Sequence, residues 1–218
     1  PVLVDADSGR IQQGMINLLR AVLRQEGLRL SSGHAESVLA RVQQLGLPAA
    51  IEVVLAPLHT MLAAIMATLT EMDAALQTRA AAEPVPQRLM TAPGVGPVLA
   101  LTFQAVLDTP ARFGGDASRA SAFVGLVPRE DSSAERQHKG SITKTGPGEL
   151  RALLVQASWA IWHSRRDRAA HLRDWVHRLA ARRGRRIAVV ALARRLTRVL
   201  YAMWRDATPF RAPMVVAA

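Results

Sequence analysis

The sequence predicts an all-α protein, with a helical coiled-coil region followed by a second helical domain. Half of its 218 residues are apolar but only 4% are aromatic, and the dominance of Ala and Leu favours helices over sheets. Apolar residues recur at spacings of three and four over long stretches. Cysteine is absent, which excludes disulfides and thiolate metal sites and favours a cytoplasmic location. The chain begins Pro1-Val2-Leu3 without a leader, so we expect a fragment rather than a secreted precursor.

The first two predicted helices are short and amphipathic. Residues 10–26 show helical spacing and end at Gly27, with an apolar face of Ile11, Met15, Leu18, Leu19, Val22 and Leu23. Ser32 is placed to cap a second helix that ends before Gly46. The residues expected to be buried there are Val38, Leu39, Val42 and Leu45.

Residues 49–79 predict one long helix whose apolar residues alternate at spacings of four and three, as in a coiled coil. The repeat consists of Ile51, Leu55, Leu58, Leu62, Ile65, Leu69, Met72 and Leu76. Pro57 should kink or break the helix. Two interpretations stay open: self-association through residues 51–76, or an ordinary bundle helix, which the second stripe of Val54 and Met61 favours. No stretch of about 18 apolar residues is free of charged residues, so we expect no membrane span.

Two prolines within residues 80–86 predict a domain boundary, with a coiled-coil region over residues 1–83 and a second domain over residues 87–218. The second domain opens with a helix, a Pro-Gly-Val-Gly turn and a helix that begins at Pro97. This order resembles a helix-hairpin-helix element, whose bare N–H groups at Gly94, Val95 and Gly96 would bind a phosphate. The alternative is a tight turn that only joins two packed helices.

A polar run over residues 125–146 follows a short helix at 117–123 and predicts a loop. It contains hydroxyls that could attack phosphorus, Ser132 and Ser133, and cations that could hold a phosphate: Arg129, Arg136, Lys139 and Lys144. Serine is a weak nucleophile without a base or metal and a positively charged surrounding. Ser and Thr in loops more often form turns and caps, which is the competing interpretation.

Three basic amphipathic helices are predicted near residues 149–164, 168–183 and 187–205. Residues 129–211 carry 19 Lys and Arg against seven Asp and Glu, whereas the rest of the chain carries nine against ten. Such polarity favours a nucleic-acid partner over a role in solubility alone. The additional arginines expected to contact nucleic acid are Arg151, Arg182, Arg183, Arg185 and Arg186. The six histidines show no metal-ligand spacing, and we predict no metal site in this chain.

Several motifs, in order, resemble the C-terminal half of the DEDD-type insertion-sequence transposases. They include the Pro-Gly-Val-Gly turn, residues 122–129, Ser132-Ser133, Gly140-Ser141-Ile142-Thr143-Lys144 and residues 187–196. The resemblance covers nearly the whole chain. It implies an RNA-guided recombinase in which a RuvC-like nuclease domain holds Mg²⁺ and a C-terminal domain supplies a serine that bonds to DNA. A structured guide RNA would specify donor and target DNA.

By position, Ser133 matches the family's serine, and Ser132 is its neighbour. The glycines that usually follow are Ala134 and Glu135 here, which restricts the backbone and adds a negative charge. No segment resembles the RuvC-like domain, because Asp5 and Asp7 lie too close to the start. We therefore expect Mg²⁺ only together with that domain, and expect the chain alone to bind nucleic acid without recombining it.

Three hypotheses follow from the sequence. The first is the C-terminal part of a transposase with Ser133 as nucleophile. The second is a non-catalytic nucleic-acid-binding module built on the helix-hairpin-helix element. The third is an oligomerisation unit held by residues 51–76, with the charge serving solubility. Binding of nucleic acid that weakens with salt separates the first two from the third.

Overall fold

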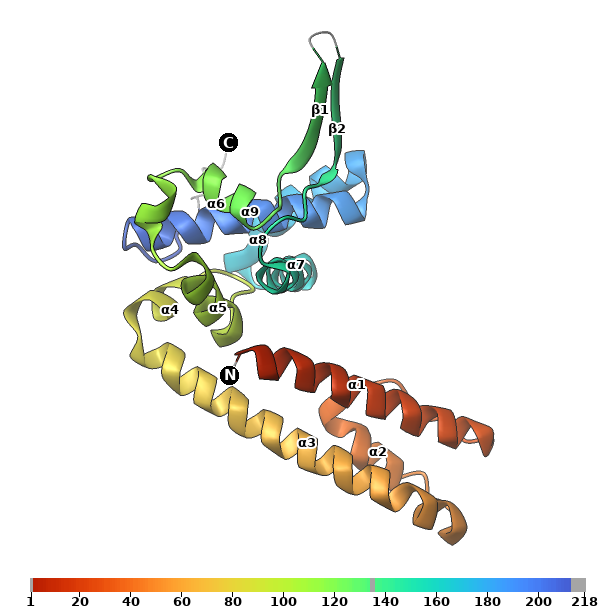
Figure 1. Cartoon of the computed structure of the whole chain (residues 1–218). Coiled ribbons are helices and arrows are strands. Elements are labelled where there is room, and N and C mark those ends of the chain that lie inside the picture. The colour runs from red at the N-terminus through yellow and green to blue at the C-terminus, as the bar shows by residue number, and fades with distance from the viewer. Residues whose placement is uncertain (1, 134–135, 213–218) are drawn as a thin grey trace. The chain divides into compact units, whose positions relative to one another are not determined.

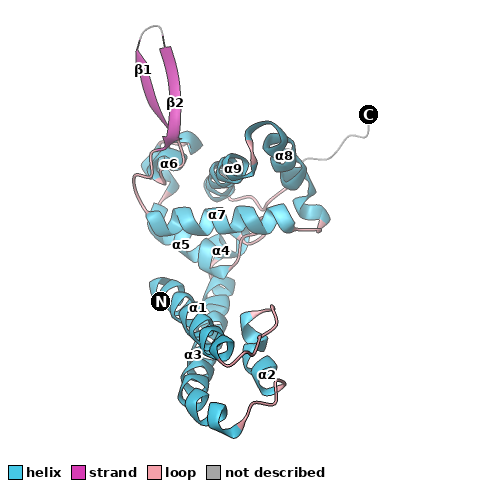
Figure 2. Cartoon of the chain, turned by 90° about the vertical axis from the view of Figure 1, so that its right-hand side faces the viewer, coloured by secondary structure: helices cyan, strands magenta, loops and turns pink. Residues whose placement is uncertain are grey.

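The structure is a computed structural model that describes residues 2–133 and 136–212, and the side chains of residues 11–129 and 140–212. The chain divides into two compact units, residues 1–78 (unit 1) and residues 79–218 (unit 2). Helices dominate the described chain, and the strands within it form one two-stranded hairpin (Figures 1 and 2). The predicted all-α class is confirmed. The domain limits at residues 83 and 87 stay predictions.

Unit 1 is built from α1 (Val2–Gln25), a short 3-10 turn (Ala35–Ser37), α2 (Val38–Gln43) and most of α3 (Ala49–Ala82). Its core brings together apolar side chains from all three helices: Ile16, Leu19, Leu23, Val38, Val42, Leu55 and Leu62. Helix α1 begins eight residues earlier than the apolar spacing predicted. The predicted Ser32 cap is wrong, since α2 starts only at Val38 and its first turn has no side-chain cap. The loop before it is held by the Arg41 guanidinium, which donates to the backbone carbonyls of Ser31, His34 and Ser37.

Helix α3 runs through Pro57 without a break. Proline removes the hydrogen bond to the carbonyl of Val53, but the Val53 side chain is 74% exposed, so water can reach that side of the helix. The predicted seam is the side of α3 that faces the unit 1 core, where Leu55 and Leu62 are buried. Val54 and Met61, on the second stripe, are largely exposed.

By length and composition alone, α3 is also apolar enough to cross a membrane. Long helices of proteins that never enter a bilayer pass the same test. The absence of a membrane partner therefore stays a prediction, as does self-association through residues 51–76.

Unit 2 begins at the end of α3 and contains α4 (Pro84–Leu89), α5 (Pro97–Leu107), a 3-10 turn (Pro110–Phe113) and α6 (Ala117–Phe123). The hairpin β1 (Pro128–Ser133) and β2 (Arg136–Ile142) follows, and then come α7 (Gly148–His163), α8 (Asp167–Arg183) and α9 (Arg185–Arg205). Helix α9 lies at the centre, in contact with α4, α6, α7, α8 and the 3-10 turn. Its Tyr201 is fully buried, and the hydroxyl donates to the Pro110 carbonyl oxygen at 2.8 Å.

The polar run after α6 is where the sequence-based prediction of a loop was wrong. Residues 128–133 and 136–142 pair as two antiparallel strands, with an irregularity in pairing between Pro128 and Glu130. It projects from the helices of unit 2 (Figure 1). Strands are recognised in sequence by alternating apolar and polar residues, whereas in this run the residues of both alternating sets are mostly polar.

Candidate nucleic-acid interface

The root of the hairpin is fixed by a small set of backbone contacts between α6 and α7. The N–H of Thr143 donates to the Val127 carbonyl at 2.9 Å, and the N–H of Lys144 donates to the Gly125 carbonyl at 3.2 Å. Arg151 of α7 reaches across, and its Nη1 donates to the carbonyls of Val124 at 2.9 Å and Thr145 at 3.2 Å. Arg151 thus ties both chain segments of the root to α7. Its predicted contact with phosphate stays a prediction.

Two glycines allow the segments at this root to approach each other. Gly125 and Gly146 have φ values of +73° and +78°, which L residues with a Cβ rarely adopt. A Cβ on Gly146 would lie 2.0 Å from the Phe123 carbonyl oxygen, and one on Gly125 would lie 2.2 Å from the Thr145 carbonyl oxygen. Both distances are far below van der Waals contact. The hairpin can leave the helices in this direction because both positions lack a side chain.

The proposed nucleophile lies at the far end of the hairpin. Ser132 and Ser133 are the last two residues of β1, and in the strand register Ser133 faces Arg136 and Ser132 faces Gln137. The side chains of Ser132, Ser133, Arg136 and Lys139 lie outside the described residues. The backbone therefore places both serines away from the helices, next to a predicted cationic residue, Arg136.

Of the predicted cations near the hairpin root, Arg129 and Lys144 are exposed. Lys144 has a φ of +55°, an unusual value for a residue other than glycine, at the point where β2 has ended and the chain turns toward α7. Both side chains are accessible to a polyanion that lies along the hairpin. Their contact with phosphate stays a prediction.

The Pro-Gly-Val-Gly turn packs tightly against α7. Gly94 has a φ of +75°, and a Cβ there would lie 2.7 Å from the Ala157 carbonyl oxygen. Val95 is buried and its N–H donates to the Ala92 carbonyl at 3.3 Å, so that N–H is already used within the turn. Gly96 is exposed, has open space around it and directly precedes α5. Gly94 therefore has a packing role, and Gly96 is the position that a phosphate could approach.

The predicted cationic corner joins α8 to α9. Gly184, with a φ of +84°, separates the two helices, and the arginines on both sides of it are exposed: Arg182, Arg183, Arg185 and Arg186. The Arg185 guanidinium lies 5.6 Å from the ring centroid of Trp159 on α7. The corner thus combines three helices, and its positive charge is presented to solvent.

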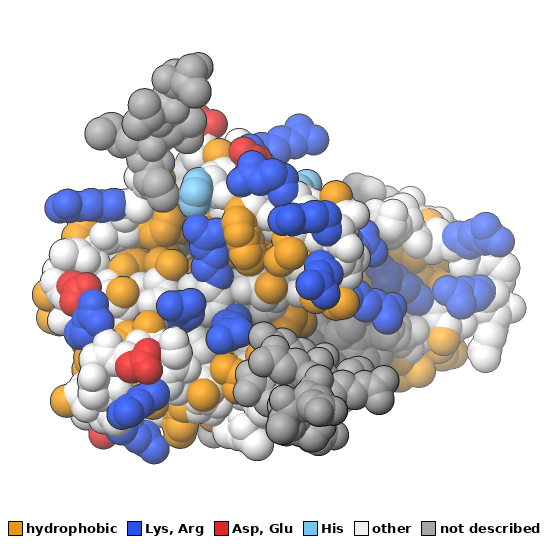
Figure 3. Space-filling model, turned by 90° about the horizontal axis from the view of Figure 1, so that it is seen from above, with side chains coloured by type: hydrophobic (Ala, Val, Ile, Leu, Met, Phe, Trp, Pro, Cys, Tyr) orange, Lys and Arg blue, Asp and Glu red, His pale blue; other side chains and the backbone are white. Residues whose placement is uncertain are grey.

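Sequence reasoning missed three arginines on the outer side of α9. Arg194, Arg195 and Arg198 line a groove of about 680 Å³ together with Trp175 of α8. The helical spacing of the sequence could have identified them. Arg194 and Arg195 lie between the buried residues Leu192 and Leu196, and Arg198 lies one turn after Arg194. Seen from above, Lys and Arg side chains are spread over the surface with apolar side chains between them, and acidic side chains are few (Figure 3).

No cluster of three or more His, Asp or Glu side chains that could hold a metal ion occurs in the described part of the chain. These residues therefore offer no carboxylate site that would fit Mg²⁺.

Comparison with known proteins places this surface in context. Residues 86–173 match the sequence model of the "Transposase IS116/IS110/IS902 family". The chain is 26% identical, over 91% of its length, to a probable family 20 transposase of Pseudomonas aeruginosa, and 29% identical, over 87%, to the transposase for insertion sequence element IS1111A of Coxiella burnetii. It is 26% identical, over 89%, to the transposase for element IS1328 of Yersinia enterocolitica.

The chain spans 58%, 53% and 58% of the length of these three relatives. The segment that the family model matches contains the glycine turn, the whole hairpin and α7. The chain is thus similar in sequence to insertion-sequence transposases over about nine-tenths of its own length.

Proposed function

We propose that this chain is the C-terminal part of an insertion-sequence transposase and recombinase, in which unit 2 binds DNA and Ser133 attacks a DNA phosphate. The observation that carries the proposal is the similarity to three transposases over about nine-tenths of the chain. These comparisons support a transposase, and the resemblance of the sequence motifs supports the DEDD type, the serine nucleophile and the guide RNA. We also expect a cytoplasmic location.

Unit 2 has the charge that a DNA-binding domain needs. Its last 90 residues carry the whole positive excess of the chain, almost all of it as arginine. The guanidinium group binds phosphate through two parallel hydrogen bonds, which suits a backbone contact that does not read sequence. A structured guide RNA would be bound through the same chemistry, and base pairing would then select the DNA.

In the proposed reaction the Ser133 oxygen forms a bond to phosphorus, and the bond from phosphorus to one deoxyribose oxygen breaks. The serine proton leaves to a base, and the departing deoxyribose oxygen takes up a proton. The cations around the hairpin, Arg129 and Lys144 among them, would stabilise the negative charge that develops on the phosphate.

The test is the trapped protein–DNA adduct. An enzyme that joins this chain to a nuclease domain of the family should form the adduct, and Ser133→Ala should abolish it while DNA affinity stays nearly unchanged. Ser132→Ala is the matched control, since it removes a neighbouring hydroxyl and should do much less. Mass spectrometry that finds the phosphate on a residue other than Ser132 or Ser133 would refute the proposed nucleophile.

A non-catalytic binding module is the second candidate, and in it the exposed Gly96, which directly precedes α5, would contact phosphate. That candidate predicts DNA binding with no adduct under any condition. We further expect the chain alone to bind nucleic acid without recombining it.

A further inference from the structure

A groove runs along the outer side of α9 within unit 2. It encloses about 680 Å³ and is lined by side chains from α6, α8 and α9: Ala117, Trp175, Ala191, Arg194, Arg195, Arg198, Val199 and Ala202. Apart from Trp175, the apolar side chains of the lining are small, and its polar groups are three guanidiniums and one indole. A groove of this composition has room for a ligand and carries a strong positive charge.

The three arginines lie together because of the period of the helix. Leu192, Ala193, Leu196 and Thr197 of α9 are buried against the rest of unit 2, so residues 194, 195 and 198 fall on the other side. Arg194 and Arg198 are four residues apart, about 6 Å along the helix axis. Two guanidiniums one turn apart can contact two phosphates of the same strand.

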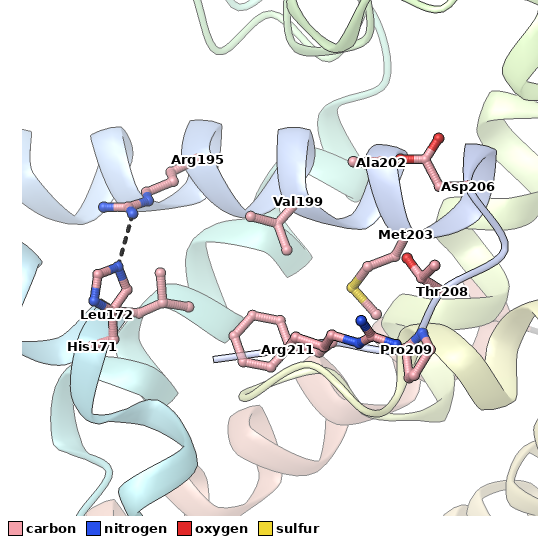
Figure 4. A pocket seen from close by; sticks show the side chains of 11 residues that line it. His171, Leu172, Arg195, Val199, Ala202, Met203, Asp206, Thr208, Pro209 and Arg211 are labelled. Carbon is pink, nitrogen blue, oxygen red and sulfur yellow. Dashed lines mark hydrogen bonds between the residues drawn. The ribbon is translucent and has the colours of Figure 1, made fainter. Parts of the chain in front are cut away.

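Arg195 is held in a fixed position. Its guanidinium lies 4.8 Å from the ring centroid of Trp175, and its Nη2 is 3.1 Å from Nε2 of His171 (Figure 4). Because arginine can only donate, His171 Nε2 must act as the acceptor, which requires an unprotonated nitrogen. Burial lowers the pKa of Arg195 from its ordinary value, and the group remains charged.

The positive charge of the groove is barely offset. Within the side chains that the structure describes, ion pairs join Arg79, Arg173 and Arg205 to carboxylates, and none involves a groove arginine. The Nε atom of Arg194 is buried and makes no hydrogen bond to any described group. The carboxylate that interacts with Arg198 belongs to Asp116, and it already accepts the Ser118 N–H at 2.7 Å at the start of α6.

A second cavity of about 300 Å³ shares Arg195, Val199 and Ala202 with the groove (Figure 4). Its other side is formed by residues 208–211 beyond α9, among them Phe210, whose N–H donates to the Thr91 hydroxyl at 2.8 Å. Arg211 from this segment and Asp206 at the end of α9 also line this cavity, so it combines two cations with one carboxylate.

We infer that the groove of α9 binds the sugar–phosphate backbone of duplex DNA, with Arg194 and Arg198 on two phosphates of one strand. The inference rests on the proposed function and adds to it a site outside the hairpin, the glycine turn and the cationic corner. Arg195 lies in the wall of the groove, where it adds a third positive charge without contacting a phosphate directly. The small side chains of Ala191 and Ala202 leave space for the sugars.

The experiment measures the affinity of the full chain for a labelled 30-base-pair DNA duplex by fluorescence anisotropy, at several salt concentrations. Loss of two phosphate contacts lowers the salt slope by about 1.8, which corresponds to roughly 60-fold weaker binding at about 0.1 M salt. The variant R194Q/R198Q should show both effects. R194K/R198K keeps the charge but loses the paired hydrogen bonds, so it should lie between that variant and the parent.

The matched control is R24Q/R29Q, which removes the same charge from two exposed arginines of unit 1. It should change the salt slope little. Equal losses of DNA affinity in R194Q/R198Q and R24Q/R29Q would overturn the assignment of the groove as a DNA-binding site, since the change in net charge would then explain both. Parent protein that does not bind DNA at all would overturn the proposed function as well. If R194Q/R198Q loses affinity only for a duplex of the same sequence in RNA, the groove binds guide RNA and the assignment to DNA is wrong.

Discussion

Gly146→Ala tests whether the close approach at the hairpin root holds unit 2 together. At a φ of +78° an L residue costs about 1–2 kcal/mol. The new Cβ would in addition lie 2.0 Å from the Phe123 carbonyl oxygen, so the backbone of one segment must move. Overpacking of this kind costs about 1–3 kcal/mol, which gives an expected loss of about 2–5 kcal/mol in the free energy of unfolding.

The control is Gly115→Ala, at a φ of +79° with no atom within 4 Å of the added Cβ. It carries the conformational cost but no collision, so the loss should be only about 1–2 kcal/mol. The difference between the two variants isolates the contact between residues 146 and 123.

Urea unfolding followed by tryptophan fluorescence is the suitable assay. All four tryptophans of the sequence lie in unit 2, so the signal reports on that unit: Trp159, Trp162, Trp175 and Trp204. A shift in the midpoint at constant slope gives the change in stability. Equal losses in the free energy of unfolding for the two alanine variants would refute a tight contact between residues 146 and 123.

Three further predictions concern other parts of the molecule. Leu62→Asp should unfold unit 1, because Leu62 is fully buried in its core, whereas Met61→Asp, at an exposed position, should leave the fold intact; circular dichroism checks both outcomes. Light scattering that finds the parent to be a monomer at high concentration would exclude self-association through residues 51–76. Binding of the parent to duplex DNA should weaken steeply between about 50 and 200 mM salt, and an affinity that does not change would refute binding through phosphate contacts. The hydrogen bond from the Ser118 N–H, and to a smaller extent nearby arginines, lowers the pKa of Asp116. The contribution of the Asp116 carboxylate to stability is therefore present above its ordinary pKa of about 4 and is lost as the pH falls through the lower pKa of the folded state. Asp116→Asn should make stability less dependent on pH in that range, and an unchanged pH profile would contradict this role.

The hairpin shows where reasoning from sequence stopped. Residues 125–146 contain the motif that marked the region, including Ser133, but gave no sign of strands. Because the hairpin projects from the helices, packing against a core does not impose an apolar face on it. What the sequence did contain were Gly125 and Gly146, whose structural reason, a close approach of backbones, becomes visible only in three dimensions.

The roles of individual arginines were also beyond the sequence. Arg151 was expected to contact phosphate, yet its Nη1 holds the hairpin root. Arg194 and Arg198 were not singled out, although they line a groove. Charge alone does not distinguish an arginine that binds carbonyls from one that faces a ligand, since the distinction depends on which neighbours the fold provides.

The sequence by itself determined the helical class, the approximate positions of most helices, and the concentration of positive charge after residue 129. These properties depend on helical period and composition, which are local or additive along the chain. The tertiary structure alone decided which helices pack against the apolar side of α3, where the hairpin leaves the helices, and which arginines share a groove. Those outcomes depend on contacts between residues far apart in the chain, such as Arg151 with Val124 and Tyr201 with Pro110, and no local pattern encodes them.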